Sequence, residues 1–392
     1  MLLKHALTFF ILLFILQVFH SRFIVTVHGI YDPLSVPNNK YGIHIIDEND
    51  LQNAAALVNS SNGSFGYVTI VIAERERNVE KWKQIFQRMR ELELIPILRL
   101  ATRLEGIVWA APKERDATEW VSFLSALPWY TKNRYIVLFN EPNHAKEWGG
   151  ELAPENYAQI LKTFSSFLKS SSDDFFILPA GLDASAPNGP DTLDEATYLL
   201  RMKNEVPDVF EYIDGWTSHS YPNPGFVGTL TQTGKGSMRT FEWELAFLKS
   251  LGVNRALPIF ITETGWPHNE GTSRVSNYYS VDTINDLIVE AAQTIWSDER
   301  IVAVTPFVLN YQSQPFSHFS WQVLGSHSFY PHFDSYRSLA KIQGVPVLVD
   351  KYFITPTPIL IAQEKTISSD ENKSVKTILY RLLALLSQAL GT

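Results

Sequence analysis

A chain of 392 residues with 45% hydrophobic and 19% charged residues has the composition of a globular protein, long enough for one barrel-sized domain with extensions. The formal net charge is −8 and no long basic block occurs, so a nucleic-acid partner is not expected. The absence of cysteine excludes disulfides, thiolate metal sites and cysteine nucleophiles.

The N-terminus carries an apolar run behind a short basic start. Residues Ala6–Phe19 form the run, and Phe23–Val27 could lengthen it past a polar interruption. The run is shorter than the about 20 residues of a relaxed transmembrane helix and is typical of a secretory signal or signal anchor. We therefore expect residues 1–27 to direct export, cleaved or retained as a membrane anchor, and residues 28–40 to form a linker.

From Tyr41 onward, short apolar runs alternate with segments of helical periodicity. The apolar runs predict eight strands, at Tyr41–Ile46, Tyr67–Ala73, Ile95–Ala101, Tyr135–Phe139, Phe175–Ala180, Ile213–Ser218, Pro258–Thr262 and Ile301–Leu309. The periodic segments predict helices at Asn78–Leu92, Thr118–Leu127, Asn156–Leu168, Thr192–Met202, Met238–Leu251, Val281–Ile295 and, as a short last helix, Ser335–Gly344.

Eight strands alternating with helices over roughly 300 residues predict an α/β fold, a (β/α)8 TIM barrel covering residues 41–344. The alternative is a doubly wound sheet, but the Gly-rich phosphate loop expected after its first strand does not follow Tyr41–Ile46. Residues 345–392 are expected to be a C-terminal extension, in which Ser374–Leu390 predicts an amphipathic helix that packs on the barrel.

Two of the predicted buried strands end in a glutamate. Tyr135–Phe139 runs into Asn140 and Glu141, and Pro258–Thr262 runs into Glu263. Because the carboxyl ends of barrel strands form the active face, the two glutamates predict a pair of carboxylates facing one another across a pocket.

Other strand ends supply further candidate side chains. Strand six offers His219 and Tyr221, strand three offers Arg99, and strand one offers His44. Aromatic residues follow both glutamates, and their rings would suit the apolar faces of a sugar. These are Trp148 and Trp266.

Together these motifs resemble the clan A retaining glycoside hydrolases, which include the family 5, family 39 and family 17 enzymes. The resemblance rests on Asn140-Glu141-Pro142 on strand four, His219-x-Tyr221 on strand six, and Thr262-Glu263 followed by Gly265-Trp266 on strand seven. It spans roughly Tyr41 to Gly344. It implies a hydrolase that cleaves a β-linked oligo- or polysaccharide by double displacement, needs no cofactor or metal, and acts as a monomer.

The resemblance also implies a role for each residue. Glu141 would be the acid/base and Glu263 the nucleophile, with their carboxyl groups roughly 5–5.5 Å apart. Asn140 would contact the sugar 2-hydroxyl, and Tyr221 would hold Glu263 in place. His219 and Arg99 would orient the site by hydrogen bonds, with Arg99 favouring an ionised Glu263.

The chain departs from the clan pattern in two places. Many members carry a tryptophan at the end of strand eight, where this chain offers Phe307, Asn310 or Tyr311, with Trp321 further on. Strand three lacks the Asp-x-His ending common in family 5. These departures leave the subfamily and the sugar open.

Three other functions were considered. A non-catalytic barrel that binds envelope polysaccharide gains nothing from paired carboxylates. A metal-dependent hydrolase using His44 and His219 is disfavoured because no His-x-His or His-Glu-x-x-His spacing occurs. An acyl-transfer enzyme is disfavoured because no Gly-x-Ser-x-Gly elbow occurs.

Overall fold

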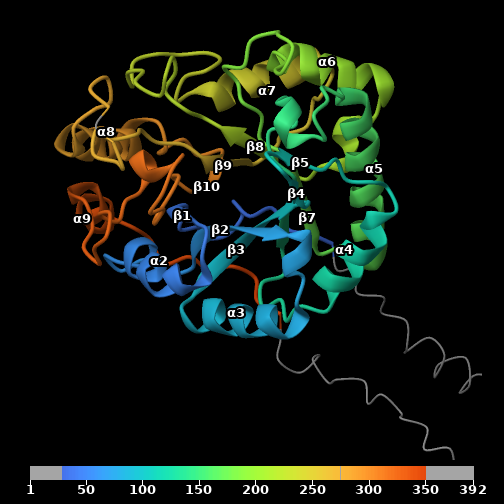
Figure 1. Cartoon of the computed structure of the whole chain (residues 1–392). Coiled ribbons are helices and arrows are strands. Elements are labelled where there is room, and N and C mark those ends of the chain that lie inside the picture. The colour runs from blue at the N-terminus through green and yellow to red at the C-terminus, as the bar shows by residue number, and fades with distance from the viewer. Residues whose placement is uncertain (1–28, 274, 350–392) are drawn as a thin grey trace, which may run out of the picture. The chain divides into compact units, whose positions relative to one another are not determined.

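Parallel strands and helices alternate along the chain, and the helices surround the strands (Figure 1). The computed structural model describes residues 29–273 and 275–349. The barrel strands of this part are β1 (Gly42–Ile45), β2 (Gly66–Ala73), β3 (Leu94–Ala101), β6 (Arg134–Leu138), β7 (Phe175–Pro179), β8 (Trp216–His219), β9 (Ile259–Glu263) and β10 (Ile301–Val304). The helices around them are α2 (Leu51–Val58), α3 (Val79–Glu91), α4 (Asp116–Ser125), α5 (Pro154–Ser171), α6 (Glu195–Glu205), α7 (Thr240–Ser250), α8 (Val281–Thr294) and α9 (Pro331–Ser338).

The strands form two parallel sheets that join at two seams. One sheet has the order β1-β2-β3-β6-β7 and the other β10-β9-β8. At the first seam Tyr41 bridges Val304 in parallel, and the Val304 amide donates to the Lys40 carbonyl at 2.9 Å. At the second seam the Asp214 amide donates to the Ile177 carbonyl at 2.8 Å. The sheets therefore close into a (β/α)8 barrel, which confirms the predicted fold class.

Large side chains fill the inside of the barrel, so it is a packed core and not a pore. Tyr135 lies at its centre, with the rings of Phe176 and Phe260 each 5.1 Å away between centroids. Outside the barrel, each helix buries one apolar face against the strands. In α3 the buried face consists of Trp82, Ile85, Phe86 and Met89, the spacing from which the helix was predicted.

All eight predicted strands are present, with differences at their ends. The predicted run Ile301–Leu309 is too long, because β10 ends at Val304. Residues 305–309 are buried, and four of the five are apolar, but they do not continue the strand. They form hydrogen bonds with the end of β1 instead: the His44 amide donates to the Pro306 carbonyl, and the Leu309 amide donates to the His44 carbonyl.

The last helix was predicted in the wrong place, and two elements were missed. Instead of Ser335–Gly344, α9 spans Pro331–Ser338, with proline in its first turn, where the missing N–H costs no hydrogen bond. The helix stops because Leu339 is extended, with ψ 141°. The missed elements are α2 and a small antiparallel hairpin of β4 (Leu104–Glu105) and β5 (Val108–Trp109).

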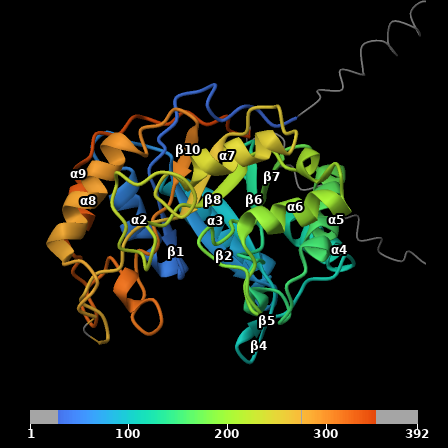
Figure 2. The same ribbon diagram turned by 90° about the horizontal axis from the view of Figure 1, so that it is seen from above.

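Residues 29–40, drawn in blue in Figure 2, lie at the end of the barrel opposite the β4–β5 hairpin. The Tyr31 amide donates to Asn133 Oδ1 at 3.2 Å, and Asn38 donates to the Val302 carbonyl at 2.7 Å. Among the described residues, no helix has the length and apolar character needed to cross a membrane. The predicted export segment (1–27) and the predicted helix Ser374–Leu390 lie outside the described residues.

Candidate active site

The backbone after β6 turns sharply to present Asn140 and Glu141 at the carboxyl end of the barrel. Phe139 and Glu141 both have positive φ, 75° and 32°, a region that residues other than glycine rarely adopt. The Glu141 amide donates to the Gly181 carbonyl beyond β7 at 3.0 Å, which ties the turn to the next strand. Strained backbone of this kind is concentrated at functional sites.

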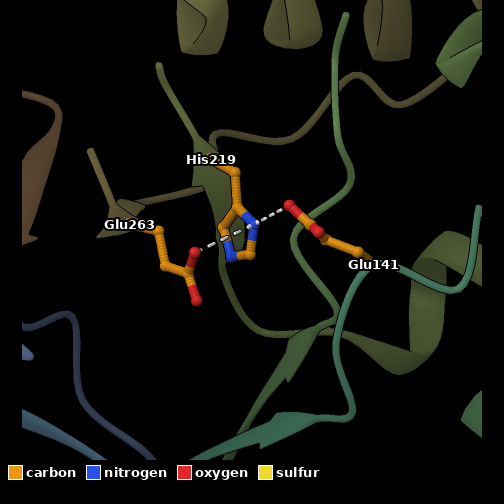
Figure 3. A group of neighbouring side chains, drawn as sticks. All are labelled: Glu141, His219 and Glu263. Atoms are coloured by element: carbon orange, nitrogen blue, oxygen red, sulfur yellow. Dashed lines mark hydrogen bonds and ion pairs between the residues drawn. The ribbon is translucent and has the colours of Figure 1, made fainter. Parts of the chain in front are cut away.

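The two glutamates meet on either side of a histidine (Figure 3). Nδ1 of His219, at the end of β8, is 2.9 Å from Glu141 Oε1 and 3.9 Å from Glu263 Oε2. One oxygen of each carboxylate and the histidine nitrogen all lie within 4.8 Å of one another. The predicted pair of facing carboxylates is therefore present.

Glu263, the last residue of β9, is almost fully buried, and both of its oxygens have hydrogen-bond donors. Arg99 donates to Oε1, and the Tyr221 hydroxyl donates to Oε2 at 3.1 Å, as predicted for both residues. Burial alone raises the pKa of Glu263, but the positive charges of His219 and Arg99 outweigh it and lower this pKa to about 2. Glu263 is therefore ionised at neutral pH.

The two histidines next to Glu263 have pKa values shifted in opposite directions. Burial lowers the pKa of His219, but the charges of Glu263 and Glu141 more than offset burial, so this pKa lies above its ordinary value. Burial and the charge of Arg99 lower the pKa of His44 to about 3, which keeps His44 neutral. His44 was predicted to bind substrate; this is wrong, because its side chain is fully buried behind Glu263, with Nε2 4.0 Å from Oε1.

Asn140 is held in one amide orientation. Arg99 Nη1 donates to Asn140 Oδ1 at 2.7 Å, which identifies Oδ1 as the acceptor and leaves Nδ2 as the donor of the amide. Nδ2 faces Glu147 Oε2 at 3.5 Å. Glu147 ends the short 3-10 helix η3 (Ala145–Glu147), and sequence reasoning missed it. The sequence feature that could have pointed to Glu147 as a site residue is its place in the segment that follows Glu141.

Neither tryptophan can stack on a sugar, so both of those predictions are wrong. Trp148 is 1% exposed, and its ring packs edge-on against Phe139 and Tyr157. Trp266 is 4% exposed and donates through Nε1 to the Gly228 carbonyl at 3.2 Å. Both rings turn into the protein core, where their area stabilises the loops that carry the glutamates.

The loop after β10 carries several aromatic side chains in the region where many clan A members have a tryptophan. Phe307 and Trp321 are buried, whereas Phe316 is 40% exposed. The Phe316 ring packs edge-on against Phe307 and Tyr311, at centroid distances of 5.2 and 5.3 Å. Phe316, which sequence reasoning did not single out, is thus the aromatic side chain of this loop that offers a face to solvent.

The Glu141, His219 and Glu263 atoms are near enough to hold a metal ion, but their surroundings favour protons instead. Arg99 places a permanent positive charge on Glu263, which opposes a second cation at the same oxygens. His219 has a raised pKa and therefore keeps its proton more readily than a metal ligand does. The set fits a hydrogen-bonded acid and base better than a metal site.

No known protein-family model matches the sequence, and no curated protein matches it. Solved structures do match. A β-xylosidase from Caulobacter crescentus superposes with a TM-score of 0.50 at 13% identity, covering 77% of this chain and 68% of that one. An endo-β-1,3-glucanase from Pseudomonas viridiflava gives 0.48 at 13% identity, covering 77% and 98%. The catalytic domain of a Streptomyces mannanase gives 0.47 at 13% identity, covering 79% and 88%.

At this identity the likeness to the xylosidase shows the fold alone. The chain has a (β/α)8 barrel, as the alternation of apolar runs and periodic segments predicted. What the barrel does depends on its own side chains.

Proposed function

We propose that the protein is a retaining glycoside hydrolase that cleaves O-glycosidic bonds in a β-linked oligo- or polysaccharide. The observation that carries this proposal is the glutamate pair, whose nearest oxygens lie within 4.8 Å. Retaining enzymes need carboxyl groups about 5–5.5 Å apart, whereas inverting enzymes need about 6.5–9.5 Å to fit a water molecule. The short separation favours direct attack by one carboxylate.

The surroundings of the two carboxyl groups divide the roles. Glu263 is ionised, with a pKa of about 2, and its side chain is 10% exposed, so it is the nucleophile that attacks the anomeric carbon. The Glu141 side chain is 20% exposed, which leaves it open to a leaving group, so it is the acid that protonates the departing oxygen. In the second step Glu141 takes a proton from water, and that water releases the sugar from the Glu263 ester.

The neighbouring side chains prepare this chemistry. Arg99 and Tyr221 each bind one oxygen of Glu263, which fixes the plane of the carboxylate before substrate arrives. His219 fixes Glu141 through Nδ1 at 2.9 Å. The β-xylosidase with the same fold supports a β-glycoside as substrate, and its description as monomeric supports a monomer here.

We also propose that the protein is exported, with residues 1–27 as a signal peptide or membrane anchor. The support is the apolar run Ala6–Phe19 behind a basic start. Cell fractionation of the full chain, beside a variant lacking residues 1–27, tests this. Retention of the full chain in the cytoplasm would contradict it.

The enzymatic proposal is tested by incubating the purified protein with β-glucans, mannans, xylans and aryl β-glycosides, beside Glu141→Gln and Glu263→Gln. Both substitutions are expected to abolish sugar release, and Glu151→Gln, an exposed glutamate nearby, is the matched control. The first product should have the β configuration by NMR, because two displacements retain it. Binding without cleavage, unchanged in all three variants, would instead identify a non-catalytic carbohydrate-binding barrel.

A further inference from the structure

Glu147 places a third carboxyl group at the site, next to Asn140. Its Oε2 lies 3.5 Å from Asn140 Nδ2, and within residues 29–273 and 275–349 no basic side chain forms an ion pair with it. Its segment is firmly held, because buried Trp148 follows it and the Gly149 amide donates to the Trp109 carbonyl at 2.7 Å. The backbone that carries Glu147 is therefore held in place, and the only side-chain hydrogen bond of its carboxyl group among the described residues is the long one to Asn140.

The Asn140 amide and the Glu147 carboxyl group place a hydrogen-bond donor beside an acceptor. Arg99 occupies Asn140 Oδ1, so the amide presents only its Nδ2 donor toward Glu147. A separation of 3.5 Å is at the outer limit of a hydrogen bond, so neither group satisfies the other well. A hydroxyl group fits such a pair, because its oxygen accepts one hydrogen bond while its hydrogen donates another.

We propose that Glu147 accepts a hydrogen bond from the sugar hydroxyl to which Asn140 donates, the 2-hydroxyl at the cleaved bond. This inference rests on the proposed function, because it takes the sugar bound beside Glu141 and Glu263 as given. It predicts that the site prefers sugars with a free 2-hydroxyl over 2-deoxy and 2-acetamido sugars at that position.

Each oxygen of Glu263 already accepts one hydrogen bond, which weakens Glu263 as an acceptor for this proton. Arg99 already donates to its Oε1 and Tyr221 to its Oε2. As positive charge develops on the anomeric carbon, the 2-hydroxyl proton becomes more acidic, and its hydrogen bond to a carboxylate strengthens. Glu147 is therefore expected to contribute mainly in the transition state, as a specificity-determining residue.

The test compares two probes that differ at one position. The 2,4-dinitrophenyl β-glycosides of glucose, mannose and xylose carry a 2-hydroxyl, whereas their 2-deoxy-2-fluoro counterparts, with the same leaving group, carry a fluorine that cannot donate. The fluoro sugars trap the covalent intermediate, so they report the first displacement at Glu263 by mass spectrometry. Both probes are applied to wild-type protein, Glu147→Gln, Glu147→Leu and the control Glu151→Gln.

Both Glu147 variants are expected to lower kcat/KM for the glycoside with a 2-hydroxyl by roughly 10- to 100-fold. The trapping rate with the fluoro sugar should stay within about twofold, because the fluorine makes no hydrogen bond to Glu147 that the substitution could remove. An equal fall with both probes, or no fall with either, would overturn the role of Glu147 and leave the hydrolase assignment standing. A wild-type protein that neither releases the aryl group nor becomes labelled would overturn both proposals.

Discussion

At the scale of single residues, the site gives two glutamates different tasks by giving them different neighbours. Glu263 is buried against Arg99 and His219, and these positive charges keep it ionised. Glu141 has one side-chain partner, His219, and more contact with solvent. In the mechanism we propose, one residue type serves as nucleophile and as acid because burial and charge differ across a few ångströms.

Removing Arg99 should move the acid limb of the pH–rate profile. Burial raises the pKa of Glu263, while His219 and then Arg99 lower it to about 2, so loss of Arg99 raises it. Glu263 must be ionised to attack, and activity is lost as pH falls through its pKa. In Arg99→Met the acid limb of kcat/KM is therefore expected about 1 to 3 pH units higher.

The matched control is Arg103→Met, because Arg103 lies on the same segment but binds Glu105 and Glu74 instead. It should keep the wild-type acid limb. If Arg99→Met also kept it, while losing activity at every pH alike, Arg99 would position Asn140 without setting the charge of Glu263.

Strand-end residues of the site were predictable, but the loop residues were not. Glu141, Glu263 and Tyr221 follow apolar runs that end at the active face, so register alone brings them together. Trp148 lies in a loop, where sequence does not tell whether a ring turns inward or outward. Glu147 was missed for the same reason, since its position depends on the conformation of η3.

At the scale of elements, the seam between β7 and β8 positions His219 next to a glycine. A Cβ on Gly181 would lie 2.3 Å from His219 Cδ2, and the Gly181 carbonyl accepts from the Glu141 amide. Only a residue without a side chain lets the His219 ring approach this backbone. The seam therefore sets the distance between His219 and Glu141.

Gly181→Ala is expected to displace His219 and lower kcat/KM by roughly 100-fold, since small misplacements of catalytic groups have effects of this size. The barrel should still fold, with a loss of about 1–3 kcal/mol from overpacking. Steady-state kinetics and thermal melting measure the two effects separately. Gly189→Ala is the control, because its Cβ would meet only Thr192 Oγ1 at 3.6 Å. Wild-type activity in Gly181→Ala would show that the ring can move freely.

The long elements were predictable because burial leaves a periodic trace, whereas short ones depend on tertiary contacts. Strands buried on both faces appear as continuous apolar runs, and all eight were found. The missed helix α2 has eight residues and no side-chain hydrogen bond at its N-cap. A helix this short is marginal alone and forms because the barrel covers its apolar face. The two-residue strands β4 and β5 are too short to show alternation.

At the scale of the whole molecule, a buried pair of carboxyl groups links stability to pH. Glu195 on α6 and Glu244 on α7 are both fully buried. Burial raises the pKa of Glu244 from its ordinary value of 4.5 to about 7, and burial together with the charge of Glu244 raises the pKa of Glu195 well above its ordinary value. The charged groups that face them are Asp183 and His219.

The raised pKa values mean that the folded protein holds more protons than the unfolded chain above about pH 4.5. Stability from this pair is complete below that pH and is lost as pH rises through the raised values. The buried His44, His268 and His332 have lowered pKa values of about 3, 4 and 3, so above neutral pH they are uncharged in both states. The window from neutral to alkaline pH therefore isolates the carboxyl pair from them.

Glu244→Gln is expected to flatten the fall of Tm between neutral and alkaline pH. Glutamine keeps the shape and removes the proton that Glu244 holds in the folded protein. Each proton so removed takes away a slope of up to about 1.4 kcal/mol per pH unit. His144 and His219, whose pKa values are raised, add a slope of the same sign in every variant. The comparison is therefore with Glu205→Gln, an exposed residue of α6 that should melt like wild type. If Tm fell equally with pH in all three proteins, the folded pair would bind no more protons than the unfolded chain, and the prediction would be wrong.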